Sequence, residues 1–271
     1  MKFIKLLGLV CLTCVTFIYT EKIISVSIEQ DEIMIKLKEI KDEYIEKPID
    51  AKIIDNTIIP GNTGKEIDID TSYKQMKKIG YFEESLISYN TIYPKISIYN
   101  NYNKYIINGN TKNKEVSIIY IIKDNFTLNN ILNIIKNKNT KITFFIDSTF
   151  LNNNIDIINK INNYEIYNYG SKGTYNKDNI IITNNIINNK SNNKSIYCLF
   201  LTKDDISLNN CADSKMHSII PSINGNYNNI KNNITNGSII LINNTKELPN
   251  IIDYINNKGY TITPLSNIIK E

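Results

Sequence analysis

From residue 116 onward, short continuous apolar runs alternate with segments in which apolar residues recur every three or four positions. The runs predict buried strands, and the spaced positions predict helices that cover them. Alternating strands and helices form parallel sheets with helical crossovers. Seven strands with connections this short favour a closed, barrel-like sheet, and an open doubly wound sheet is the alternative. The predicted strands are 116–122, 141–146, 165–167, 195–201, 216–221, 238–242 and 260–263.

Three predicted helices each carry one apolar face. These faces consist of Leu128, Ile131, Leu132 and Ile135; Leu151, Ile155, Ile158 and Ile161; and Leu248, Ile251, Ile252 and Ile255. Further helices are expected at 177–189 and 205–214, with a closing turn at 265–270.

The chain before residue 116 has a different pattern. Residues 28–47 place apolar side chains at a 4-3-4 spacing and end at Pro48, which predicts one amphipathic helix acting as a stalk. Asparagine is absent before residue 56 and dense after it, so we place a boundary there. Residues 56–115 are rich in turn residues, with a short helix predicted at 71–79. The predicted organisation is 1–22 anchor or signal, 23–55 stalk, 56–115 small irregular subdomain and 116–271 barrel.

The first residues resemble a targeting segment. Lys2 and Lys5 precede an apolar run at 6–19, and no small-residue cleavage site follows. Residues 3–20 are just long enough to span a bilayer. We expect an uncleaved single-pass membrane anchor with the body of the chain outside the cytoplasm. A cleaved signal, which would release a secreted protein, and a buried soluble helix are the alternatives.

Composition and charge exclude some kinds of partner and of metal centre. The net charge is +4, and all 31 basic residues are Lys. A nearly balanced charge without the forked guanidinium group of Arg argues against a nucleic-acid partner. The single His excludes a metal centre that needs several imidazoles. Abundant Ile, Asn, Lys and Tyr are typical of an A/T-rich genome, as in low-GC Firmicutes.

Two cysteines lie in the body of the chain. In an exported protein, Cys198 and Cys211 would either pair as a disulfide or remain free, with Cys198 a buried thiol in an apolar run. Closure of such a loop would contribute about 3 kcal/mol to the free energy of unfolding.

Three segments, in order, resemble the polysaccharide deacetylase (NodB homology) family, and the chain is similar to a degenerate clostridial-type member. They are Lys141-Ile-Thr-Phe-Phe-Ile146; Glu165-Ile-Tyr-Asn-Tyr-Gly170; and Gly237-Ser-Ile-Ile-Leu-Ile-Asn243, followed by 248–252 and 258–260. The resemblance covers residues 116–271. It implies an α/β fold, the irregular (β/α)7 barrel of that family, and places the chain in carbohydrate metabolism of the cell envelope.

The same resemblance implies a divalent metal such as Zn²⁺, held by one Asp and two His, with a second Asp as base and a later His as acid. In this chain the paired Asp positions are Ile121 and Ile122, and the two His positions are Tyr169 and Gly173. The acid position is Asn243, and no Arg is present to orient a carboxylate. His217 corresponds to none of these positions. We therefore expect the metal to be lost and no cofactor to remain.

Several functions stay open. We expect a catalytically inactive relative that binds cell-wall glycan or an envelope protein, since a fold does not secure a function. One alternative is an active amide hydrolase of cell-wall glycan that uses a non-standard constellation, in which paired carboxylates perform acid–base chemistry. Another is a structural envelope protein without a ligand. The candidate polar residues of the cleft are Asp124, Asp147, Asn168, Tyr169, Lys172 and Asn243.

Overall fold

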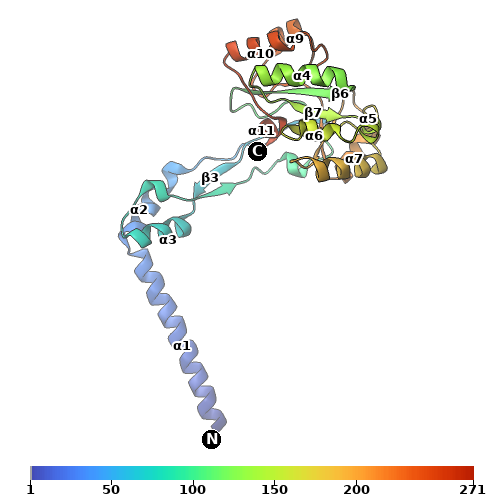
Figure 1. The fold of residues 1–271 in the computed structure, drawn as a ribbon. Coiled ribbons are helices and arrows are strands. Elements are labelled where there is room, and N and C mark those ends of the chain that lie inside the picture. Colours follow the sequence, from blue (N-terminus) through green and yellow to red (C-terminus); the bar gives the residue numbers. More distant parts are fainter. Residues whose placement is uncertain (1) are drawn as a thin grey trace. The chain divides into compact units, whose positions relative to one another are not determined.

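The computed structural model describes residues 2–271, except for the side chains of residues 2–12 and 24. The chain forms two compact units. The first comprises the residues up to Pro48 together with Thr63–Ile92, and the second comprises Ile49–Asn62 together with Tyr93–Glu271. Figure 1 shows the elements of both.

The first unit is a small helical module with one hairpin. Its buried core is formed by Ile33, Leu37, Ile67 and Met76. Asp31 caps α2 by accepting a hydrogen bond from the Ile33 amide, so the helix predicted over 28–47 is divided. Its elements are α1 (Lys2–Glu29), α2 (Glu32–Ile40), η1 (Lys41–Tyr44), β3 (Gly64–Ile67), α3 (Ile69–Ile79), η2 (Glu84–Leu86) and β4 (Tyr89–Ile92).

The predicted anchor at 1–22 falls within α1, and most of its apolar side chains lie outside the described residues. Among the side chains that the structure does describe, no helix has the length and apolarity that a membrane span requires.

The second unit contains the sheet. All seven predicted strands form, and β1, β2, β5 and β11 extend the sheet beyond them. The strands are β1 (Lys52–Ile54), β2 (Thr57–Ile59), β5 (Tyr105–Ile106), β6 (Glu115–Ile122), β7 (Thr143–Ile146), β8 (Glu165–Asn168), β9 (Tyr197–Leu199), β10 (His217–Ile219), β11 (Ile223–Gly225), β12 (Ile239–Ile242) and β13 (Thr261–Ile262).

The strand order is β1-β2-β5-β10-β9-β8-β7-β6-β12-β11, with β13 also paired to β6. From β5 to β11 all neighbours are parallel, as the alternating pattern predicted. Strands β10 and β11 lie far apart in this order, yet only three residues join them. A linker that short holds the two strands close in space, so the sheet curls into a barrel whose hydrogen-bond ladder stays open.

Helices cover the outer face of the curled sheet. They are α4 (Asn125–Asn137), α5 (Ser148–Asn153), α6 (Ile157–Ile161), α7 (Lys177–Lys190), α8 (Asp205–Asp213), α9 (Tyr227–Asn233) and α10 (Leu248–Asn257). Helix α11 (Leu265–Ile269) and η3 (Ile98–Asn100) contribute to the inner core. The predicted helix face at 151–161 is divided between α5 and α6.

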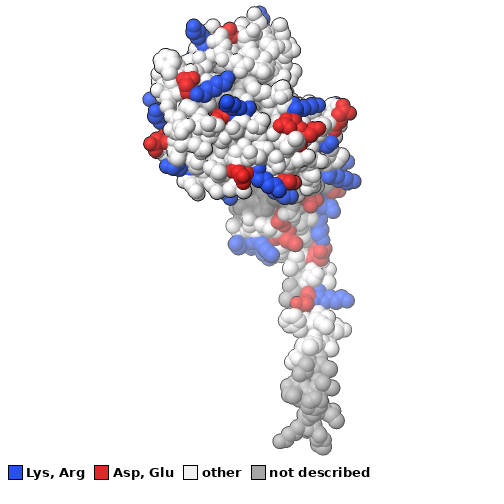
Figure 2. All heavy atoms as spheres, turned by 90° about the vertical axis from the view of Figure 1, so that its right-hand side faces the viewer, with Lys and Arg blue, Asp and Glu red and all other residues white. Residues whose placement is uncertain are grey.

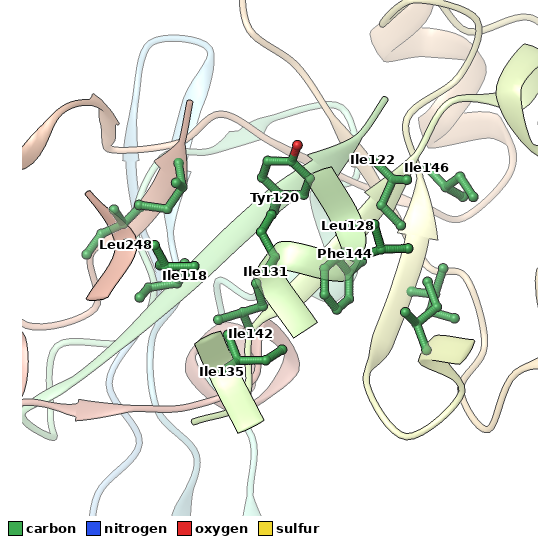
Figure 3. Packing of buried hydrophobic residues seen from close by; sticks show 14 of the residues in the cluster. Ile118, Tyr120, Ile122, Leu128, Ile131, Ile135, Ile142, Phe144, Ile146 and Leu248 are labelled. Carbon is green, nitrogen blue, oxygen red and sulfur yellow. The ribbon is translucent and has the colours of Figure 1, made fainter. Parts of the chain in front are cut away.

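Strand β6 serves two cores with its two faces, because successive side chains on a strand point in opposite directions. Ile118, Tyr120 and Ile122 pack outward with the α4 face, as Figure 3 shows. Ile119 and Ile121 point inward to a core closed by α11. The strand is buried on both sides, which explains its continuous apolar run.

Glu271 ties early and late parts of this unit together. Its carboxylate accepts hydrogen bonds from the backbone amides of Gly61 at 3.1 Å and Ile98 at 3.0 Å, and from the hydroxyl of Ser97. Because hydrogen bonds to a charged acceptor are stronger than neutral ones, this clasp fixes the strands added before β6.

The contacts divide the chain differently from the predicted boundaries. Residues 49–62 and 93–115 belong to the barrel unit, and 63–92 belong with the N-terminal helices. The reason is strand pairing: β2 and β10 both pair with β5. The contacts therefore divide residues 56–115 between the two units and place residues 23–48 in the first unit.

Candidate functional site

In a parallel α/β sheet, ligands bind at the carboxyl ends of the strands. We call this the carboxyl end of the barrel: the ends of β6 to β9 and β12 with the loops that follow them. Figure 2 looks at the molecule from the side on which α5 and α7 lie in Figure 1, and charged side chains of both signs are scattered there among uncharged surface.

The loop after β8 occupies the place of the expected metal-binding loop. Ser171 and Thr174 pair across a tight turn whose central residues, Lys172 and Gly173, have φ of 53° and 84°. Positive φ at both central residues is what a type I′ turn requires, and it explains the Lys-Gly dipeptide. A Cβ atom at Gly173 would lie 3.0 Å from the hydroxyl oxygen of Tyr169. A side chain at residue 173 would be strained at this φ and would need the Tyr169 ring to move by a few tenths of an ångström.

Tyr169 is partly buried and packs against the inner core. Its amide continues the sheet by donating to the carbonyl of Ile146 at 2.9 Å. Burial, and then the nearby Asp147 carboxylate, raise the pKa of its phenol. A neutral phenol whose ring covers a core is a poor metal ligand at neutral pH.

Asn168 is fully buried and holds the loop from inside. Its side-chain oxygen accepts a hydrogen bond from the Gly170 amide at 2.6 Å, and its amide donates to Asn184 at 3.0 Å. The buried Tyr175 hydroxyl donates to the Asn168 carbonyl at 3.0 Å and accepts from the Leu199 amide at 2.7 Å. Asn168 is therefore a structural residue and is closed to a ligand.

Asp147 is the N-cap of α5. Its carboxylate accepts hydrogen bonds from the amides of Thr149 at 2.8 Å and Phe150 at 3.1 Å. The other carboxylate oxygen accepts from the backbone amide of Lys172 at 2.6 Å. The exposed Lys172 thus contacts this carboxylate through its backbone. Asp147 joins α5 to the loop after β8, and each of its carboxylate oxygens accepts a hydrogen bond from a backbone amide.

Asp124 is the N-cap of α4 and is exposed. It accepts hydrogen bonds from the amide of Thr127 at 2.7 Å and from its hydroxyl at 2.9 Å. The amide hydrogen bond is the main reason that the pKa of this carboxyl lies below its usual value. Nearby, burial raises the pKa of Tyr120 to about 12. Asp124 and Asp147 each cap a different helix and face different neighbours.

The remaining family positions are filled by apolar or amide groups. Ile121 belongs to the inner core and Ile122 to the outer one. Figure 3 shows Ile122 beside Ile146. Asn243 is exposed after β12, and its amide donates to the side-chain oxygen of Asn224 at 2.5 Å.

These residues do not fit the metal that the family resemblance implies. Two positions are packed isoleucines, one has no side chain, and one is a phenol lying on the core. Within the part of the chain that the structure describes, no three His, Cys, Asp or Glu residues are grouped so as to hold a metal ion. No metal-dependent step is derived for this chain.

Cys198 on β9 and Cys211 on α8 form a disulfide. Both residues are fully buried, in a cluster with Tyr105, Tyr175 and Phe200. The bond fastens a helix to the strand on which it packs. The sequence allowed either a disulfide or free thiols at these two cysteines, and the structure contains the disulfide.

His217 lies at the start of β10, at the opposite end from the expected site. Its ring stacks on Tyr102, with centroids 4.5 Å apart, and lies 5.4 Å from Tyr99 and 6.0 Å from Tyr197. Burial lowers the pKa of the imidazole to about 4. That His217 lies outside the family positions could be predicted from the sequence. Its contacts with the tyrosines could not, because these residues come from other segments of the chain.

No family model matches the chain, and no curated protein does. Several solved structures share its fold. These matches agree with the topology described above, and the fold is that of family 4 carbohydrate esterases (CE4). Among the matches is Bacillus subtilis PdaA, described as a family 4 carbohydrate esterase, with 15% identity and a TM-score of 0.52 over 82% of this chain and 97% of that one.

A CE4 family pseudoenzyme from Bacillus anthracis has 21% identity and a TM-score of 0.63, over 88% of this chain and 95% of that one. A mutant of that Bacillus anthracis pseudoenzyme, described as having restored enzymatic activity, matches this chain with the same TM-score at 20% identity. At this level the similarity is one of fold. It confirms the predicted polysaccharide deacetylase-type α/β barrel and the resemblance on which that prediction was based.

Proposed function

We propose that this chain is a catalytically inactive, deacetylase-like protein that is anchored in the cell membrane, faces outward and binds cell-envelope glycan or an envelope protein. The observation that carries the proposal is the loop after β8. Its two ligand positions are a phenol packed on the core and a glycine at a φ of 84°. The metal of the family is lost in this proposal, because the residues at its ligand positions do not suit a metal ion.

The location rests on two features. The described part of α1 leaves Val15, Phe17 and Ile18 between 51% and 66% exposed, which suits burial in lipid. The Cys198–Cys211 disulfide is typical of an oxidising compartment. Cleavage of the first segment would give a secreted form of the same protein.

An active hydrolase built on Asp124, Asp147 and Lys172 is disfavoured by the geometry. Both carboxylates already accept hydrogen bonds from helix-start amides. A general base must reach the proton that it removes, and these oxygens are directed at backbone amides instead.

The test is the zinc content and acetate release of the full chain in a non-ionic detergent. After incubation with excess Zn²⁺ and desalting, we expect zinc at the level of a metal-free control protein. We also expect no acetate from N-acetylated glycan. A stoichiometric amount of retained zinc, or acetate release abolished by Asp124→Asn or Asp147→Asn, would overturn the proposal.

A further inference from the structure

The barrel has a second face with its own hollows, at the start of the strands and the end of the helices. We call this the amino end of the barrel. Three adjoining hollows of about 270, 370 and 310 Å³ lie there. The first two share Lys141, Asn163 and Tyr164, and the last two share Asn139 and Thr140. Because neighbouring hollows share lining residues, we call the three together the amino-end groove.

Two tyrosines line the groove and are held in place. Tyr164 stands edge to face against the fully buried Phe144, with centroids 5.5 Å apart at 89°. Tyr260 has the Lys114 ammonium 5.0 Å from its ring centroid. Both rings are partly exposed. A fixed, half-exposed ring with a polar tip suits stacking on a sugar, because little side-chain entropy is lost on binding.

Amide side chains surround these rings. Asn139, Asn163 and Asn256 are exposed and line the groove. An amide offers two donors and one acceptor, which complements hydroxyl and acetamido groups. Their side chains make no hydrogen bond within the described part of the chain, in contrast to the buried Asn168 at the other end of the barrel.

The groove is also cationic. Lys136, Lys138 and Lys141 line it, and Lys114 lies over the ring of Tyr260. Lys136 and Lys138 lie at the carboxyl end of α4, where the helix dipole favours positive charge. Of the nearby acids, Asp253 pairs with Lys138 at 2.7 Å, and Glu165 turns inward to Thr143 and Ser266. The ammonium groups of Lys136 and Lys141 have no partner among the described residues.

We infer that the amino-end groove binds an anionic glycan, a sugar chain that carries carboxylates or phosphodiesters. The rings stack on the sugars, the amides bond their hydroxyls, and the two unpaired lysines attract the charge. The inference deepens the proposed binding role. It places the ligand at the face opposite the expected catalytic end, so its failure would leave the proposed loss of catalysis intact.

The test is calorimetric titration of the full chain with oligogalacturonate, with oligomeric poly(glycerol phosphate) and with neutral chitotetraose. We expect one or both anionic chains to bind, with affinity falling as salt screens the charges, and the neutral chain to bind more weakly. Binding of only one anionic chain identifies the anion. Lys136→Ala with Lys141→Ala should weaken binding about tenfold.

Lys123→Ala with Lys203→Ala, on exposed lysines at the carboxyl end, is the matched control and should leave the affinity unchanged. Tyr164→Leu keeps an apolar group packed on Phe144. It should weaken binding by a further factor of about three, because the stacking of the ring on the sugar is lost. Equal effects of the two lysine pairs would overturn the inference. So would equal affinity for the neutral chain, or absence of anionic binding by a chain whose circular dichroism shows it folded.

Discussion

The two ends of the barrel use their polar residues in opposite ways. At the carboxyl end, Asp124, Asp147 and Asn168 are spent on helix caps and on the loop after β8. At the amino end, Lys136, Lys141 and Asn163 leave their polar groups without protein partners in the described chain. The difference teaches that a polar residue at the expected end of a fold can be structural, while free binding capacity lies elsewhere.

The largest expected effect is at the carboxyl end. Asn168→Ala should lower the free energy of unfolding by about 3 kcal/mol, because it leaves the buried Gly170 amide unpaired and removes the hydrogen bond to the partly buried Asn184 side chain. Asn243→Ala, at an exposed asparagine of the same end, should change it by less than about 0.5 kcal/mol. Urea denaturation measures both. Similar values for the two variants would break the contrast between a buried and an exposed polar group.

A smaller effect is expected at the amino end, from His217. Its folded pKa of about 4 lies below the ordinary 6.5, so between these values only the unfolded chain binds the proton. The stabilisation from the neutral ring is therefore complete above pH 6.5 and is lost as the pH falls. The loss should reach about 2 kcal/mol at pH 5.

His217→Phe keeps an aromatic ring among the tyrosines and removes the titration. The difference between the two stability–pH curves isolates the imidazole, because the carboxylates contribute to both. Parallel curves between pH 6.5 and 4 would show that the ring titrates normally and is not sealed in the folded protein.

The smallest effect sharpens the role of the caps. Asp124→Ala should cost about 1 kcal/mol through the loss of the Thr127 hydrogen bonds. Asp156 occupies the N-cap of α6 without a side-chain capping bond, so Asp156→Ala is the matched control and should cost little. If thermal unfolding shifts equally in both variants, Asp124 is not acting as a cap.

The sequence predicted the barrel well because its strands are buried on both faces. The run at 116–122 and the α4 face at Leu128, Ile131 and Ile135 left little ambiguity. The sequence did not predict strands that depend on pairing with segments far away along the chain. Residues Tyr105 and Ile106 form a two-residue strand that gains its place only by pairing with β2 and β10. Such a strand has no periodicity of its own.

At the candidate site, the residues that occupy the family's positions could be identified from the sequence, but most of the contacts they make could not. Ile121, Tyr169 and Gly173 could be read directly from their positions. The capping roles of Asp124 and Asp147 had a signal, since each precedes a helix with Thr or Ser nearby. The amino-end groove had none, because Tyr164 and Tyr260 are nearly a hundred residues apart and meet one depression only through the fold.

The clasp made by Glu271 bears on how the protein is made. Its partners Gly61 and Ile98 precede it by 210 and 173 residues. During synthesis, the strands before β6 therefore wait until residue 271 has been made before this contact forms. Long-range contacts of this kind slow folding, because loop closure must come before their reward. Until Glu271 has been made, the segment that carries β1 and β2 lacks this link to the rest of the unit, and unpaired strand edges are prone to aggregation.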